Sequence, residues 1–86
     1  MKTRKDLCPW IVEALTELGG NAKIAKVKEF IWDHHGIELH NSGNLHFTWN
    51  EDVFWAATQL RAKGILKKAS DTPRSVWALS DAKRNA

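Results

Sequence analysis

Apolar residues recur at helical spacing near the start of the chain and predict an amphipathic helix over residues 7–18. Asp6 precedes this helix as an acidic cap-region residue, and Pro9 suits its first turn, where a missing N–H leaves no backbone hydrogen bond unmade. Gly19 and Gly20 end the helix, because the left-handed backbone that often follows a helix favours glycine. The apolar stripe consists of Leu7, Trp10, Ile11, Ala14, Leu15 and Leu18.

A second stripe with the same spacing predicts a helix from about Lys23 to His34, which Gly36 ends. Residues 21–22 form a short extended link before it. The stretch 37–48 is rich in His, Asn, Gly and Ser, so it predicts a connecting loop with at most one helical turn. The second stripe consists of Ile24, Val27, Phe30 and Ile31, and the apolar residues that pin the loop are Leu39, Leu45 and Phe47.

A third helix is predicted to begin at Asn50, whose side chain suits the N-cap position. Glu51 and Asp52 follow in the first turn, where the helix dipole favours negative charge. The helix then continues to Lys63, and Gly64 ends it.

Two short apolar runs near the C-terminus flank a polar turn. Residues 65–69 and 75–79 are the runs, and residues 70–74 are rich in turn-forming side chains. This pattern predicts a β-hairpin. Trp77 and Leu79 share one face of the second strand, because side chains alternate along a strand.

The order helix, extended link, helix, loop, helix, hairpin predicts an α+β domain that is mainly α, with winged helix-turn-helix architecture. In this architecture the third helix lies on the surface and the hairpin forms a wing beside it. A chain of 86 residues is long enough for one domain. We therefore expect a single domain over 1–86, with an ordered core over about 6–80 and a polar, frayed tail at 81–86.

Composition excludes several classes of protein. With 43% hydrophobic and 27% charged residues, the chain is expected to be globular and not disordered. Its polar start does not resemble a signal peptide, and its apolar runs are too short to span a membrane. A single cysteine, Cys8, allows no internal disulfide, so the reducing cytoplasm is the simplest compartment.

Positive charge is concentrated in the second half of the chain. Residues 1–49 hold six basic and six acidic residues, whereas residues 50–86 hold seven basic and four acidic residues. Five of the basic residues lie in one short stretch that contains a single acid, Asp71. A positive patch this compact can meet phosphate, and a solvated charged surface is the alternative. The five are Arg61, Lys63, Lys67, Lys68 and Arg74.

Two segments carry a resemblance to a known family. WAATQLRAKGIL at 55–66 and SVWALS at 75–80 resemble the N-terminal winged-helix domain of Mrr-type restriction endonucleases, and a looser likeness covers about residues 7–80. The resemblance implies a domain that targets DNA, in restriction or regulation, while a separate domain cuts it. No nuclease domain is expected within these 86 residues. The family tends to carry Asn-Arg where this chain has Glu51 and Asp52.

These features together predict a non-catalytic protein that binds double-stranded DNA. The third helix would enter the major groove, and basic side chains of the wing would neutralise phosphates. The candidate contacts are Asn50, Thr58 and Arg61 for the groove, Lys67, Lys68 and Arg74 for the flanking backbone, and Lys23 and Lys26 for further phosphates. Adjacent lysines on a short edge strand also discourage pairing between sheet edges, which is the alternative role of Lys67 and Lys68.

A protein-interaction or dimerisation module is the alternative function, and the acidic start of the third helix favours it. An exposed Phe54 would contact a thymine methyl group or a partner protein, whereas a Phe54 folded under the preceding loop would belong to the core. The core interpretation of Phe54 is favoured. Trp49 has the same two interpretations and is expected to act as a hydrophobic staple at the helix start.

Neither a metal site nor an enzyme is expected from the motifs. The histidines match no compact zinc-binding pattern, so no metal and no other cofactor is predicted. Cys8 lies near Asp6 but lacks a third catalytic group, and we expect it to be a small buried residue. The chain also lacks Gly-rich phosphate loops and Gly-x-Ser-x-Gly. The histidines are His34, His35, His40 and His46.

Overall fold

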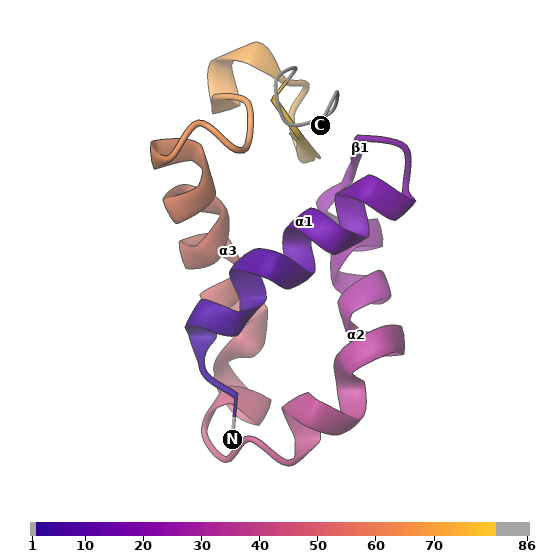
Figure 1. The fold of residues 1–86 in the computed structure, drawn as a ribbon, viewed down its shortest axis with the longest axis vertical. Coiled ribbons are helices and arrows are strands. Elements are labelled where there is room, and N and C mark those ends of the chain that lie inside the picture. Colours follow the sequence, from indigo (N-terminus) through magenta and orange to yellow (C-terminus); the bar gives the residue numbers. More distant parts are fainter. Residues whose placement is uncertain (1, 81–86) are drawn as a thin grey trace.

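A computed structural model describes residues 2–80, which form three α-helices and a small antiparallel sheet (Figure 1). The predicted α+β class with mainly helical content is confirmed. The predicted tail at 81–86 lies outside the described residues. The elements are the 3₁₀ turn η1 (Arg4–Asp6), α1 (Leu7–Glu17), β1 (Asn21–Lys23), α2 (Ile24–His40), α3 (Leu45–Ala62), the 3₁₀ turn η2 (Ala69–Asp71) and β2 (Val76–Ala78).

The first helix follows its sequence pattern closely. α1 buries its predicted stripe except for Leu18, which lies just beyond the helix and is exposed. The next two residues, Gly19 and Gly20, have φ values of 97° and 100°. Such a backbone is strained for other residues. The N–H of Gly20 donates to the carbonyl of Leu15 at 2.7 Å, so the double glycine closes the last turn.

The prediction that the second helix ends near His34 is wrong, because α2 continues through Gly36 to His40. Gly36 packs against the indole of Trp32, since a Cβ atom placed on it would lie 3.4 Å from that ring. Leu39 in the added turn is completely buried. Burial of this leucine offsets the low helix propensity of glycine, and so the helix passes through Gly36.

The prediction that the third helix begins at Asn50 is also wrong. α3 begins at Leu45, after Asn44, so Asn50 is not an N-cap but an exposed residue inside the helix. Leu45 and Trp49 are each 6% exposed and lie one turn apart, and their burial stabilises the added turns. Trp49 is therefore a core residue and not a staple at the helix start. The predicted loop shrinks to residues 41–44.

The sheet pairs segments that are far apart in the chain. β1 runs antiparallel to β2, and Ala22 lies opposite Trp77. The predicted extended link after the first helix is therefore a strand. The N–H of Leu79 also donates to the carbonyl of Gly20 at 2.8 Å, which extends the contact beyond the two strands.

The predicted C-terminal hairpin is reduced to a single bridge between Leu66 and Leu79. Two backbone hydrogen bonds flank this bridge: Lys67 N–H donates to Ala78 at 2.9 Å, and Ser80 N–H donates to Ile65 at 2.9 Å. β2 uses one edge for β1 and the other for this segment, so it lies between them. The chain between the two sides of the bridge forms a loop at 67–75.

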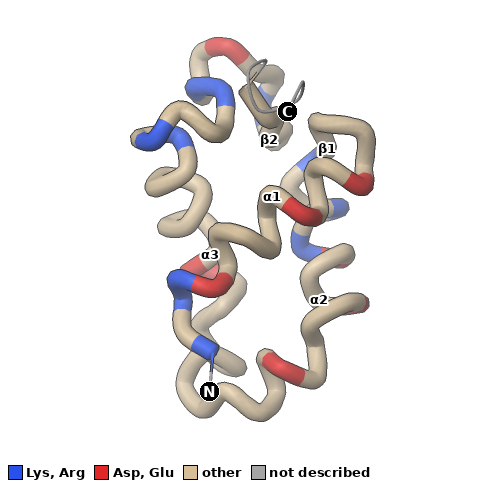
Figure 2. Tube along the Cα trace, viewed as in Figure 1, with Lys and Arg blue, Asp and Glu red and all other residues tan. Residues whose placement is uncertain are grey.

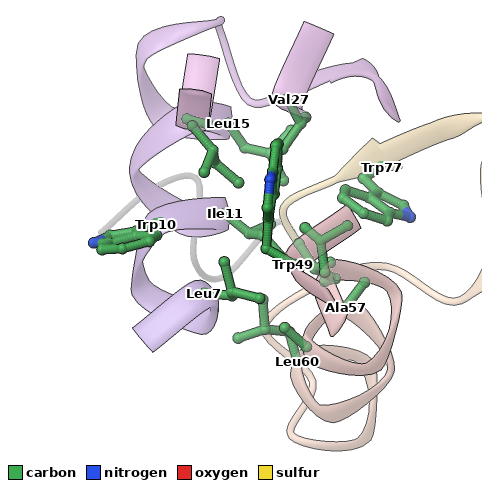
Figure 3. Packing of buried hydrophobic residues seen from close by; sticks show 14 of the residues in the cluster. Leu7, Trp10, Ile11, Leu15, Val27, Trp49, Ala57, Leu60 and Trp77 are labelled. Atoms are coloured by element: carbon green, nitrogen blue, oxygen red, sulfur yellow. The ribbon is translucent and has the colours of Figure 1, made fainter. Parts of the chain in front are cut away.

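One hydrophobic core joins the three helices and β2. Figure 3 shows labelled side chains from all four elements meeting there, including Ile11, Val27, Trp49 and Trp77. Trp77 is only 2% exposed. A buried indole removes roughly 150–250 Å² of surface from water, so Trp49 and Trp77 contribute much of this core.

α1 lies across α2 and α3 in the view of Figure 1. One side of the α2–α3 pair is therefore covered by α1, and the opposite side has no covering helix within the described residues. Among residues 2–80, no helix combines the length and the apolar character needed to cross a bilayer.

Candidate nucleic-acid interface

α3 presents one continuous face to solvent. Its positions recur every three or four residues, which places them on the same side of a helix. Asn50 and Thr58 are exposed there, and Arg61 is half-buried at the C-terminal end. We call this surface the α3 outer face; it consists of Phe47, Asn50, Glu51, Phe54, Thr58 and Arg61.

Phe54 lies in the middle of the α3 outer face and is 47% exposed, so the favoured core interpretation is wrong. Its ring meets the ring of Trp77 edge-on, with centroids 5.7 Å apart and an interplanar angle of 74°. The ammonium of Lys28 lies 5.6 Å from its centroid. The predicted loop before Asn50, which was expected to cover Phe54, is instead helical from Leu45 onward and does not cover the ring. One side of the Phe54 ring therefore stays open to solvent.

Thr58 and Glu51 complete the polar part of this face. The Thr58 hydroxyl donates to the carbonyl of Phe54 at 3.1 Å, which uses its proton and leaves its lone pairs facing outward as acceptors. Glu51 is exposed and puts a carboxylate on the same face. The α3 outer face therefore carries more hydrogen-bond acceptors than cations.

Basic side chains gather where α3 ends. Arg61, Lys67 and Lys68 line one surface pocket of about 400 Å³, together with the carboxylate-bearing Asp71. Within the described residues, the buried Nε of Arg61 has no hydrogen-bond partner. Three predicted contacts from the helix and the following segment are thus brought together, and their summed charge favours an anion at this position.

Lys23 and Arg74 lie near the paired strands. Lys23 lies opposite Val76 in the β1–β2 register, and Val76 follows Arg74 by two residues. Both basic residues are exposed. Ser75 between them has a φ of 63° and accepts a hydrogen bond from Ile24 N–H at 2.8 Å, so the turn that presents Arg74 is anchored to the start of α2.

Lys26 is placed differently from the other candidates. Its ammonium lies 4.0 Å from Glu29 one turn later, in an exposed pair. The carboxylate offsets its charge, although an exposed pair of this kind is weak. Figure 2 shows other Lys and Arg positions near the C-terminal end of α3, around β1 and near the N-terminus.

Sequence reasoning missed Lys28 and the exposed apolar residues. Lys28 contacts α3 from α2, and no spacing within one helix reveals a contact between two. Phe47, expected to pin a loop, is 81% exposed, and Ile37 is 80% exposed. Trp32 is half-exposed and stacks on Trp49, with centroids 6.1 Å apart. The amphipathic pattern predicts these apolar side chains on the surface only when it is applied to the full observed lengths of α2 and α3.

The histidines take separate local roles. His34 Nδ1 lies 3.0 Å from the Phe30 carbonyl, and His40 and His46 meet edge-on. His35 bridges α1 and α2. In the described part of the chain, no group of three or more His, Cys, Asp or Glu side chains is placed to hold a metal ion.

Cys8 is half-buried against α3. Its Sγ lies 3.9 Å from the carbonyl oxygen of Ala56, and burial raises the pKa of the thiol despite the nearby charge of Lys63. A raised pKa lowers the thiolate fraction, which disfavours nucleophilic chemistry.

Comparison with protein-family models, curated proteins and solved structures found no match. The resemblance of residues 55–66 and 75–80 to Mrr-type domains therefore stays a prediction, and so does the winged helix-turn-helix assignment.

Proposed function

We propose that this protein is a non-catalytic winged-helix domain that binds double-stranded DNA. The α3 outer face enters the major groove, and the loop at 67–75 lies on the flanking phosphates. The observation that carries the proposal is the pocket in which Arg61 from α3 meets Lys67 and Lys68. The pocket thus joins α3, which can enter the major groove, to the following segment, whose lysines can bind phosphate.

The order of elements supports the winged-helix assignment. An exposed third helix is followed directly by the segment bridged through Leu66, by the loop, and by a returning strand. β2 lies between β1 and that segment. The loop at 67–75 thus starts a few residues after the end of α3, as a wing must if it is to reach DNA beside the recognition helix.

The size and chemistry of α3 suit the groove. Its 18 residues give a length of about 27 Å. The major groove, about 12 Å wide, admits a helix with its side chains. Asn50 and Thr58 offer hydrogen-bonding groups to base edges, and Glu51 can accept from a cytosine amine, whereas a phosphate would repel it.

Phosphates would be held at two places. The pocket formed by Arg61, Lys67 and Lys68 provides one, and the exposed pair Lys23 and Arg74 provides the other. Contacts of this type raise affinity for any sequence and weaken with salt.

A fluorescence titration with duplex DNA at low and at high salt tests the proposal. Binding at low salt that weakens as salt rises is expected. Lys68→Glu is expected to weaken binding strongly, whereas Lys5→Glu, the same charge change at an exposed residue of η1, changes it little. No binding at low salt, or equal losses in the two variants, would overturn the proposal.

A protein-interaction module is the second candidate, because exposed apolar side chains lie on the α3 outer face and on α2. Phe47 and Ile37 are each about four-fifths exposed, and Phe54 about half. Trp49 no longer belongs to this set, since it is buried. Light scattering separates the candidates: a concentration-dependent dimer that Phe54→Ser disrupts, with no affinity for DNA, would favour this one.

A further inference from the structure

Phe54 is held in place but left open on one side. The buried Trp77 supports its ring from β2, and Lys28 approaches from α2. Two elements outside α3 thus restrict this side chain, so it would lose little rotamer freedom when it meets a ligand. An exposed aromatic ring that is already fixed is suited to recognition.

The neighbours of Phe54 on the α3 outer face set its chemical context. Asn50 lies four residues before it and Thr58 four residues after it, so an amide, a phenyl ring and a hydroxyl follow one another along one line. Four helical residues rise about 6 Å. On a helix that follows the major groove, side chains three or four residues apart contact successive base pairs, so consecutive members of this line face neighbouring base pairs.

In the major groove, the 5-methyl group of thymine is the apolar group that phenylalanine contacts. An asparagine amide can bond both N7 and the amino group of adenine. The hydroxyl of Thr58 already donates to the Phe54 carbonyl, so it offers acceptor lone pairs, which suit an amino group of adenine or cytosine. All three groups can therefore be satisfied by a site that contains A·T pairs.

We propose that Phe54 determines specificity by contacting the 5-methyl group of thymine, with Asn50 directed to adenine in a neighbouring base pair. This inference rests on the proposed binding of double-stranded DNA. It names the kind of site that the domain prefers: a duplex with thymine methyl groups in the major groove. Lys28, beside the ring, is left to meet a backbone phosphate.

Labelled hairpin duplexes of alternating dA-dT and of alternating dA-dU test this contact, because they differ only in the 5-methyl group. Both offer every register to the protein. The wild type is expected to bind the dT duplex about fourfold more tightly for one buried methyl group. Phe54→Ala is expected to bind both duplexes equally.

Two variants control for indirect effects. Phe54→Leu keeps an apolar side chain against Trp77, so it should fold and retain part of the preference if Phe54→Ala proves unstable. Ile37→Ala removes an exposed apolar side chain of α2 outside the α3 outer face and should keep the full preference.

The outcomes separate this inference from the function on which it rests. Equal binding of both duplexes by the wild type, or a preference that survives in Phe54→Ala, would overturn the role of Phe54 and leave DNA binding intact. Failure to bind any duplex at low salt would overturn both. If dimerisation or capture of a protein partner then depends on Phe54, the ring serves protein contact instead.

Discussion

The imidazole of His35 joins α2 to Glu13 of α1, with Nε2 2.7 Å from the carboxylate oxygen Oε1. Its other nitrogen, Nδ1, lies 2.9 Å from Oε1 of Glu38. A carboxylate only accepts hydrogen bonds, so both contacts are made together when both ring nitrogens carry protons. The ring also stacks on Trp10, with centroids 4.1 Å apart, which suits a cation over an indole.

This arrangement predicts that the domain loses stability as pH rises above about 6.5. Burial lowers the pKa of His35, but the hydrogen bonds and charges of Glu13 and Glu38 outweigh it and raise the pKa above the ordinary 6.5. A raised folded-state pKa gives stability that is complete below about pH 6.5 and is lost as pH rises through the folded-state value. Urea unfolding at several pH values should show this fall, and His35→Gln should flatten it.

Glu38 determines how the stability contributed by this cluster falls at acid pH. Its hydrogen bond to His35 lowers its pKa from the ordinary 4.5, and Lys2, 3.5 Å away, acts in the same direction. A lowered pKa gives stability that is present above 4.5 and is lost as pH falls through the folded-state value. Greatest stability from this cluster is expected between these limits, and a wild-type unfolding midpoint that rises steadily from acid to alkaline pH would contradict it.

Removal of the buried indole from β2 should destabilise the protein strongly. Trp77→Ala is expected to lower the free energy of unfolding by about 3–5 kcal/mol, because the ring is almost fully buried. Trp32→Ala, at a half-exposed tryptophan, should cost about 1–2 kcal/mol through its lost stacking on Trp49. Chemical denaturation followed by circular dichroism measures both, and equal losses would argue against this difference in burial.

Two glycines should respond to alanine in opposite directions. Gly64 has a φ of 76° with open space around its Cα, so Gly64→Ala should destabilise the protein by about 1–2 kcal/mol through backbone strain alone. Gly36 is helical, and an added Cβ would make ordinary contact with Trp32, so Gly36→Ala should stabilise it by up to about 1 kcal/mol. Thermal melting of the two variants checks the signs.

Salt dependence should distinguish the basic residues. If Arg74 or Lys23 contacts a phosphate, its replacement by alanine should reduce the slope of log affinity against log salt by about 0.9. Lys26→Ala should change the slope less, because Glu29 already offsets its charge. Titrations over a range of salt concentrations measure these slopes, and an unchanged slope in Arg74→Ala would remove that residue from the interface.

The helical content could be predicted from sequence, but the boundaries of α2 and α3 could not. Local rules treat Gly36 and the polar stretch after it as the end of a helix. Burial of Leu39 and Trp49 outweighs those preferences, and burial depends on contacts between helices that a one-dimensional pattern does not contain.

For the strands too, local pattern could be predicted from the sequence, whereas pairing between distant segments could not. Alternation predicted that Trp77 and Leu79 share one face, and both side chains are buried. The pairing of β2 with β1 was not predicted, because Ala22 lies far from Trp77 in sequence. The polar residues Asn21 and Lys23 beside Ala22 also have low strand propensity.

The candidate site could be predicted only in part. Thr58 belongs to the exposed face of the predicted helix, so periodicity was enough to place it outside, whereas Asn50 was predicted as an N-cap and is instead an exposed residue inside α3. The pocket that unites Arg61 with the following lysines depends on the turn after Gly64, and the Lys28–Phe54 contact depends on the packing of α2 on α3. Both follow from tertiary structure.

The position of β2 between β1 and the segment at Leu66 has a consequence for synthesis on the ribosome. All three helices emerge before residues 76–79, yet those residues complete both sides of the sheet and bring Trp77 to the core. A nascent chain halted at residue 75 would lack Trp77 and both strand pairings. The cooperative fold therefore waits for the last strand to clear the exit tunnel.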